Sequence, residues 1–186
     1  MKKLLFSVLF LGMINYLNAQ QQKITTVQYA GSIGYLSLGV GITNKSGKVQ
    51  HELLYGFVPK YYGGPLDKIT YRLTYLPIEI KQKGKLSWRP INPVVFAAYN
   101  MGNQFSLEHS HKNYDQDYYW WSPALRFHIG ANTALFISGK KQTTMLYLEA
   151  NTNDRYITTY WDNTRNMSLG DLFYLGLGVK FLFNEQ

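Results

Sequence analysis

The segment Glu108-His109-Ser110 combines an acid, an imidazole and a hydroxyl, which are the residue types of a nucleophilic triad. The spacing is unfavourable, because neighbouring side chains of a strand point to opposite faces. The segment also lies in a polar connection at about 102–117, so only a loop could bring the three groups together. These residues are candidates for a catalytic site, and a solvated loop is the simpler interpretation.

Patterns for a metal or a cofactor are incomplete. His109 and His111 could share one face of a strand, but no clear third ligand accompanies them. The chain has no cysteine, which excludes a disulfide-stapled fold, a Cys-ligated zinc site and a thiol nucleophile. The glycines at 31–34 and 39–41 precede no helix, so they do not form a dinucleotide-binding loop. We therefore expect no metal and no cofactor.

A second group of ionisable residues emerges when the chain is read with a period of two. Alternation places six of them on the same face as small and polar residues: Glu52, Arg72, Arg126, His128, Glu149 and Lys180. Charges inside a narrow barrel must be paired or hydrated. We expect a polar network that fills the lumen, and a passage or an anion-binding site is the functional alternative.

Strands must position these residues, because the period of two dominates the chain after residue 19. The final segment is clearest, where large apolar residues occupy every second position from Phe173 to Phe183. We predict seven strands, at 35–42, 49–60, 68–75, 91–101, 118–129, 143–151 and 172–183. An eighth is expected at Ile24–Ala30, or as part of a strand that this interpretation has merged with its neighbour.

Two all-β architectures fit this alternation. A soluble sandwich or calycin-like barrel turns its apolar face inward, whereas a transmembrane barrel turns it toward lipid. Small residues such as Ser37, Gly39 and Gly176 on the second face suit a crowded lumen better than a water-exposed surface. Aromatic residues near the predicted strand ends, including Trp88 and Tyr99, suit the girdles of a membrane barrel.

The N-terminus favours export. Lys2 and Lys3 precede an apolar stretch, Leu4–Ile14, and Ala19 offers a small residue for cleavage, so residues 1–19 are predicted to be a signal peptide. Residues 20–186 then form one barrel domain. The formal charge of +8 loses two lysines with this segment and becomes +6. Export argues against nucleic acid as a partner and favours an anionic lipid surface.

Two segments carry a resemblance to a known family. Gly178-Val179-Lys180-Phe181-Leu182-Phe183 resembles the terminal strand of Gram-negative outer-membrane β-barrels, with its glycine followed by alternating hydrophobic residues and an aromatic end. Leu76-Pro77-Ile78-Glu79-Ile80, followed by a Lys/Gly turn and Arg89-Pro90, is similar to the mid-barrel hairpin of small outer-membrane barrel-domain proteins.

The resemblance implies an eight-stranded, antiparallel, up-and-down transmembrane β-barrel in the outer membrane. Its terminal strand, with Gly178, Phe181 and Phe183, would be the signal for the barrel-assembly machinery. The partners would be outer-membrane lipid and lipopolysaccharide, and the barrel would be a monomer. Short turns at 43–48, 83–85 and 138–142 would face the periplasm, and the segments near 61–67, 102–117 and 152–168 would face outside.

The function expected from this class is non-enzymatic, either in the envelope itself or in binding a ligand or partner. A lipid A-modifying enzyme of the deacylase or acyltransferase type is the first alternative. Such deacylases place His and Ser two positions apart on a strand, whereas His109 and Ser110 are adjacent. A soluble, periplasmic, calycin-like binder is the further alternative.

Overall fold

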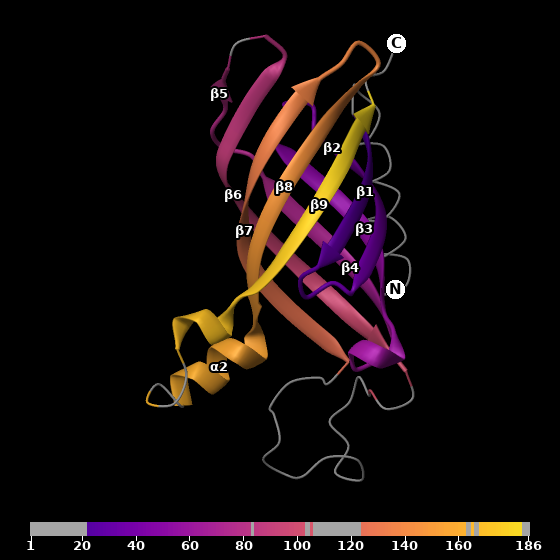
Figure 1. The fold of residues 1–186 in the computed structure, drawn as a ribbon, viewed down its shortest axis with the longest axis vertical. Helices are drawn as coiled ribbons and strands as arrows, with labels where there is room; N and C mark the ends of the chain where they lie inside the picture. The colour runs from indigo at the N-terminus through magenta and orange to yellow at the C-terminus, as the bar shows by residue number, and fades with distance from the viewer. Residues whose placement is uncertain are drawn as a thin grey trace, which may run out of the picture.

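The computed structural model describes residues 22–82, 84–102, 105, 124–162, 165 and 168–183. In these ranges eight strands form a closed antiparallel barrel (Figure 1). The strands are β1 (Lys23–Ala30), β2 (Leu36–Thr43), β3 (Val49–Val58), β4 (Leu66–Tyr75), β6 (Leu86–Met101), β7 (Leu125–Ser138), β8 (Gln142–Asn153) and β9 (Tyr174–Phe183). Each strand pairs with its neighbours in the chain, β1 pairs with β9, and the pairing of β4 with β6 completes the ring. The predicted eight-stranded, up-and-down barrel is confirmed.

The eighth strand is β1, as the N-terminal stretch predicted. The short strand β5 (Ile80–Lys81) pairs with the first part of β6 and forms a hairpin that extends beyond the barrel wall (Figure 1). Pro90 and Pro93 lie in β6 around a register shift between Arg89 and Asn92. Proline lacks a backbone N–H, so it is tolerated where a bulge interrupts the ladder.

Two strands differ most from the prediction: β6 begins at Leu86 rather than at 91, and β7 is displaced along the chain. The strand expected at 118–129 is β7, which runs from Leu125 to Ser138, and residues 118–123 lie outside the described residues. The strand continues past Gly130 because Asn132, Ala134 and Phe136 alternate with outward-facing residues. A Gly-Ala-Asn-Thr stretch conceals this alternation, because all four of its residues are small or polar.

The predicted polar connection at 152–168 contains a short helix, α2 (Asp154–Asp162). The Asn153 side chain accepts a hydrogen bond from the Tyr156 backbone N–H at 2.9 Å, and Asp154 lies in the first turn. An amide oxygen before the first turn and an acid within it both stabilise a helix start. A 3₁₀ turn, η1 (Lys60–Tyr62), lies between β3 and β4, and a second, η2 (Leu169–Leu172), follows α2 before β9.

The connections divide the barrel into two ends. The turn end, at the top of Figure 1, carries the connections 44–48, 76–85 and 139–141. The loop end, at the bottom, carries 31–35, 59–65 with η1, the strand ends Met101 and Leu125, and α2 with η2. The segments expected to lie together on one side of a membrane therefore share an end, as far as they are described.

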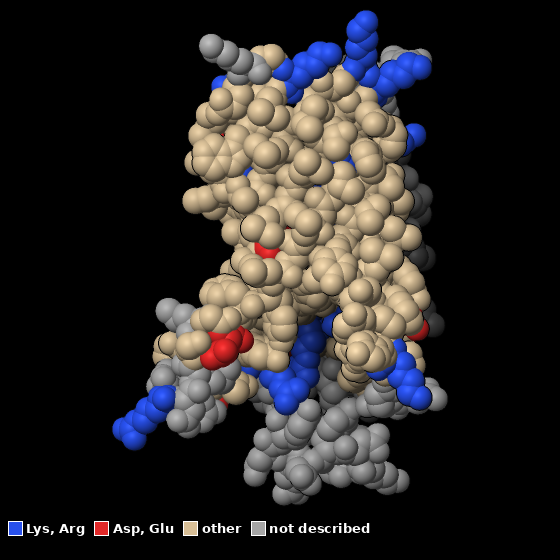
Figure 2. All heavy atoms as spheres, viewed as in Figure 1, with Lys and Arg blue, Asp and Glu red and all other residues tan. Residues whose placement is uncertain are grey.

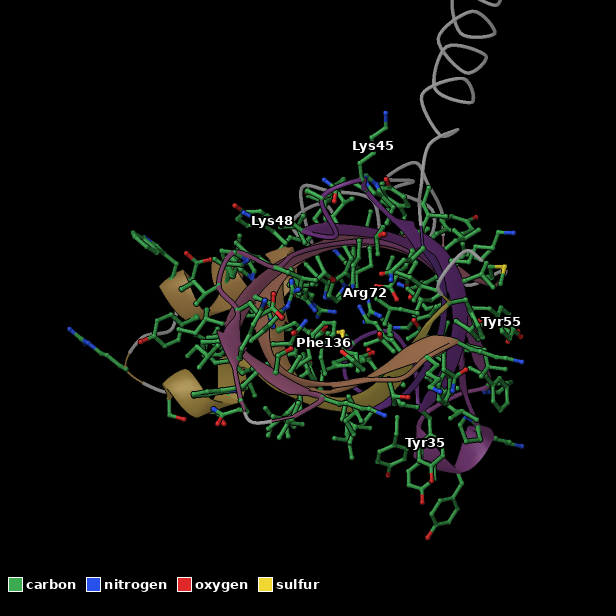
Figure 3. All side chains as sticks on the ribbon, turned by 90° about the horizontal axis from the view of Figure 1, so that it is seen from above. Tyr35, Lys45, Lys48, Tyr55, Arg72 and Phe136 are labelled. Atoms are coloured by element: carbon green, nitrogen blue, oxygen red, sulfur yellow. The ribbon has the colours of Figure 1, made fainter. Side chains whose placement is uncertain are left out.

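Side chains fill the barrel interior, as the view along its axis shows (Figure 3). One apolar cluster near the turn end includes Leu76, Phe136 and Met145, and a second toward the loop end includes Ile33, Leu54 and Phe96. Leu76 and Ile33 belong to connections rather than strands, yet each is at most 1 % exposed. The two connections thus fold into the lumen and close it from both ends.

Candidate functional site

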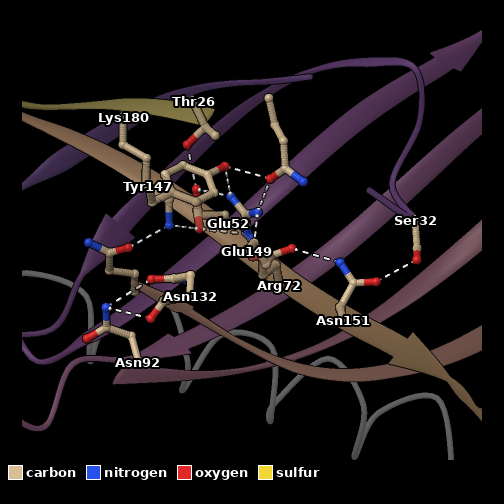
Figure 4. A network of polar contacts seen from close by, with 12 residues as sticks. Thr26, Ser32, Glu52, Arg72, Asn92, Asn132, Tyr147, Glu149, Asn151 and Lys180 are labelled. Atoms are coloured by element: carbon tan, nitrogen blue, oxygen red, sulfur yellow. Dashed lines mark hydrogen bonds and ion pairs between the residues drawn. The ribbon is translucent and has the colours of Figure 1, made fainter. Parts of the chain in front are cut away.

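The lumen contains a network of buried charges centred on Glu52 of β3 (Figure 4). Arg72 of β4 donates to both carboxylate oxygens, from Nε to Oε2 and from Nη2 to Oε1, each at 3.0 Å. Lys180 of β9 donates from Nζ to Oε2 at 2.7 Å. A two-pronged arginine contact is the strongest geometry for a carboxylate. One acid therefore pairs with two cations, which come from β4 and β9.

A second acid balances the network. Glu149 of β8 lies with Oε2 at 3.4 Å from Arg72 Nη1, so the four charges sum to zero. Neutral groups satisfy the remaining donors: Gln28 accepts from Arg72 Nη1 at 2.6 Å, and Gln50 accepts from Lys180 Nζ at 2.7 Å. A buried ion pair is tolerated when its partners are complete.

Tyr147 of β8 joins the two cations. Its hydroxyl donates to Gln28 Oε1 at 2.6 Å and accepts from Arg72 Nη2 at 3.3 Å. Its ring centroid lies 5.5 Å from Arg72 Cζ and 5.1 Å from Lys180 Nζ, within range of cation–π attraction. The ring requires the glycine beside it, because a Cβ on Gly178 would lie 2.4 Å from Tyr147 Cζ.

The network extends toward the loop end through amides. Asn151 donates from Nδ2 to Glu149 Oε1 at 3.1 Å, and its Oδ1 accepts from the Ser32 hydroxyl. Ser32 belongs to the 31–35 connection, so hydrogen bonds tie this closing segment to the buried charges. Asn92 and Asn132 form a separate amide pair between β6 and β7 (Figure 4).

The network is sealed from solvent. The side chains of Glu52, Arg72, Glu149 and Lys180 have no solvent-accessible surface. Charges without access cannot exchange protons or substrates with bulk water. The arrangement is suited to holding the wall together, because it joins β1, β3, β4, β8 and β9 across the lumen.

Four of the six predicted lumen residues therefore meet, and two do not. Arg126 and His128 of β7 lie nearer the loop end. Arg126 Nη1 is 3.7 Å from Asp154 Oδ2, and the His128 ring stacks on Phe96 with centroids 4.3 Å apart. Neither residue contacts Glu52 or Glu149 by a hydrogen bond or ion pair within the described part of the chain.

The alternation missed the neutral members of the network, which include Gln28, Gln50, Tyr147 and Thr26, whose hydroxyl donates to Glu52 Oε1. A signal for them existed, since Gln28 and Tyr147 share the inward parity of their strands with Thr26 and Glu149. Glutamine and tyrosine are also common outside polar networks, so their presence on a lumen face is a weaker signal than a charged residue. Their role depends on which strands meet across the lumen, which parity alone does not tell.

The remaining predicted residues divide between the described and the undescribed parts. Glu108, His109 and Ser110 lie outside the described residues. In the terminal strand, Gly178 faces the lumen, whereas Phe183 faces outward with 42 % of its surface exposed, and Phe181 is half-buried. The described residues contain no group of three or more His, Asp or Glu that could hold a metal ion.

The outer face of the wall is apolar. Figure 2 shows an almost uninterrupted band without acidic or basic side chains between two charged ends. Aliphatic residues such as Leu38, Leu53 and Leu177 occupy the middle of the strands and are more than half exposed. Most of the outward-facing aromatic residues of the strands lie nearer the strand ends: Tyr29, Phe57, Tyr99 and Phe127 toward the loop end, and Tyr75, Trp88 and Phe183 toward the turn end. Tyr55 and Tyr71 also face outward, from within β3 and β4.

The two ends carry different charge. The turn end carries exposed lysines with Glu79 as the one acid in its described part: Lys23, Lys45, Lys48, Lys81, Lys85, Lys140 and Lys141. The loop end mixes acids and bases around exposed tyrosines, where Tyr35 stacks on Tyr62 with centroids 4.5 Å apart. Hydrogen bonding to Tyr62, and then to Tyr29, raises the pKa of Tyr35 to about 12. This phenol therefore stays neutral at physiological pH.

Among the described residues, no helix has both the length and the hydropathy that crossing a membrane would require.

Comparisons of the chain with protein-family models, with curated proteins and with solved structures find no match. The function is therefore inferred from the geometry of the barrel.

Proposed function

We propose that the chain is an integral outer-membrane β-barrel protein with a non-enzymatic role, acting in the envelope or by binding a ligand or partner. One observation carries the proposal: adjacent residues of the same strands place paired charges inside and an apolar band outside. A soluble protein of this size rarely exposes a continuous apolar patch beyond a few hundred Å². A wall that faces acyl chains favours this distribution.

The aromatic edges support the same assignment. Rings with an apolar body and a polar tip settle at the boundary between lipid and water, above and below an aliphatic belt. A soluble calycin-like barrel would turn the apolar face inward and leave the polar face to water. Its lumen would not need an ion-pair network with every partner present.

The sealed lumen supports a role other than conduction. Eight strands leave room for side chains or one small ligand rather than an aqueous channel. In this barrel the clusters around Leu76 and Ile33 lie above and below the buried charges. We therefore assign the biological role either to the loop end, which we propose lies outside the cell, or to the wall through its contacts with lipid and lipopolysaccharide.

Membrane fractionation tests the proposal. The full chain, residues 1–186, is produced in a Gram-negative host, and its membranes are washed with alkaline carbonate. We expect the protein to stay in outer-membrane fractions, to require detergent for extraction, and to migrate faster unheated than heated in a denaturing gel. Release by carbonate, without detergent, would overturn the proposal.

Planar bilayer recording tests the non-conducting role. Purified wild-type barrel should give no steady conductance, because the Glu52 network and the apolar clusters fill the lumen. Long-lived, voltage-independent current from the folded barrel would contradict a sealed lumen while leaving membrane insertion intact.

A further inference from the structure

An open cavity of about 390 Å³ lies at the rim of the loop end. Lys68 of β4 and His128 of β7 line its buried side, and Tyr35 and Tyr62 line its exposed side. Tyr174 and Asn153, where β9 begins and β8 ends, line another part of the wall. A volume in this range suits a small molecule of about the size of a sugar phosphate.

The cavity carries an excess of positive charge. Lys68 Nζ donates to the Ser32 carbonyl oxygen at 3.0 Å, and an ammonium group has two further protons to donate. Among the described residues that line the cavity, Lys68 is the one charged side chain, and Arg126 lies at the same end of the barrel with its Nη1 3.7 Å from Asp154 Oδ2. The balanced network below contributes no net charge that would offset them. In Figure 2 basic side chains occupy a recess at this end.

A buried polar atom in the cavity wall lacks a partner. His128 is 6 % exposed, and its Nδ1 makes no hydrogen bond in the described part of the chain. Stacking on Phe96 holds the ring in place, with the planes 8° apart. A buried ring nitrogen without a partner is destabilising, and a small turn of the ring that brings it to a ligand in the cavity would remove that cost.

We infer that this cavity binds a small organic anion, whose carboxylate or phosphate group contacts Lys68 and His128 and whose ring lies against Tyr35 and Tyr62. The stacked pair of tyrosines offers an aromatic surface to the C–H face of a sugar ring or to a planar ring. Lys68 supplies the charge, and the His128 ring supplies a hydrogen-bond donor in the appropriate tautomer. The inference rests on the proposed function, because it assigns a ligand class to the binding end of a barrel with a closed lumen.

Titration calorimetry on the purified, folded full chain in detergent micelles tests the inference. The probes are glucose 6-phosphate, glucuronate, inorganic phosphate and neutral glucose. We expect at least one of the two sugar anions to bind and glucose not to bind. Preference for glucose 6-phosphate or for glucuronate identifies phosphate or carboxylate as the recognised group. Equal binding of glucose, or no binding of either sugar anion, would overturn the inference.

Matched variants locate the site. Lys68→Gln should weaken binding of the preferred anion about tenfold or more, because it removes a charged hydrogen-bond donor. Lys60→Gln removes an exposed cation from η1 at the same end and should change affinity less than twofold. Equal losses in both variants would show diffuse surface attraction and contradict a built site. Gel mobility of unheated samples establishes that each variant is folded.

A second variant keeps the test independent of buried positions. Tyr62 is exposed, so Tyr62→Ala should leave the fold intact. It should weaken the sugar anion more than inorganic phosphate, since only the former has a ring to stack. An equal loss of affinity for the sugar anion and for inorganic phosphate would show that the tyrosines do not contact the ligand's ring. Membrane retention of the same preparations is measured in parallel, so a retained barrel that binds no anion contradicts this inference and leaves the proposed function standing.

Discussion

The inner and outer faces of the barrel wall differ in polarity in the opposite sense to a water-soluble protein. On β4, Tyr71 points outward and is 48 % exposed, whereas Arg72 points inward and has no exposed surface. On β9, Leu177 and Lys180 show the same inversion. A water-soluble protein buries its leucines and exposes its lysines. The comparison teaches that the centre of the lumen is held by paired charges, whereas the exterior is apolar, which is the distribution that the proposed function explains.

The largest effect should come from the interior. Glu52→Gln leaves Arg72 and Lys180 buried beside one remaining acid, and breaking a buried pair costs about 3–5 kcal/mol. Urea unfolding of the barrel in lipid vesicles measures the loss. Glu79→Gln is the matched control, because this acid forms a partly exposed pair with Arg89 at 3.5 Å and should cost under about 1 kcal/mol. Similar losses would contradict the contrast between lumen and surface.

The next effect concerns the outer face. Leu177→Arg places a cation at mid-strand toward acyl chains, and it should cost about 2–4 kcal/mol in a bilayer. Phe183→Arg makes the same kind of change near the end of β9, where the cost should fall to about 0–1 kcal/mol. Unfolding in vesicles gives both values. A cost that does not depend on depth would show that the band does not face a membrane.

A smaller effect probes the fit of the lumen. Gly178→Ala puts a methyl group 2.4 Å from the Tyr147 ring, and overpacking of this kind costs about 1–3 kcal/mol. Because of this clash, even a small uncharged side chain at Gly178 should destabilise the barrel, although the position faces the lumen. Val179→Ala only shortens an outward-facing neighbour and should cost less by the same unfolding assay. A larger loss of stability for Val179→Ala than for Gly178→Ala would contradict a tight contact between Gly178 and the Tyr147 ring.

The smallest effect lies outside both faces, in the capping box of η2. The Ser168 backbone N–H, followed by its hydroxyl, holds the pKa of Asp171 below its ordinary value of 3.8. A lowered folded pKa stabilises η2 above pH 3.8, and this contribution disappears as the pH falls through the folded pKa. NMR of the Ser168 amide should therefore show the cap persisting at pH 4 or above and opening below it. Asp171→Asn should remove this pH dependence. A wild-type cap that stays closed after the Asp171 carboxylate is protonated would contradict the role given to that carboxylate.

Much of the fold could be predicted from residue alternation. The period of two in β4 and β9 gives both the strands and the faces on which Arg72 and Lys180 lie. It failed for β7, where Gly130 and its small neighbours interrupt the apolar alternation. It also missed α2, whose start depends on a single cap by Asn153 within a segment that is otherwise typical of a loop.

The geometry of the candidate site could be predicted only in part. Parity placed Glu52, Arg72, Glu149 and Lys180 inside, but not which of them touch. That depends on the stagger between strands, for example the pairing of Thr26 with Lys180 across the β1–β9 closure. The closing roles of Ile33 and Leu76 arise from connections that fold inward, which no strand pattern describes.

Site-specific fluorescence quenching tests the central claim that the apolar band faces lipid. The chain has no cysteine, so Leu177→Cys and Lys140→Cys each offer one labelling position. With the labelled barrel in vesicles, we predict that a quencher on the lipid acyl chains reaches the label at 177 and that aqueous iodide reaches only the label at 140. Strong iodide quenching at 177, with none from the acyl chains, would contradict a membrane-spanning barrel.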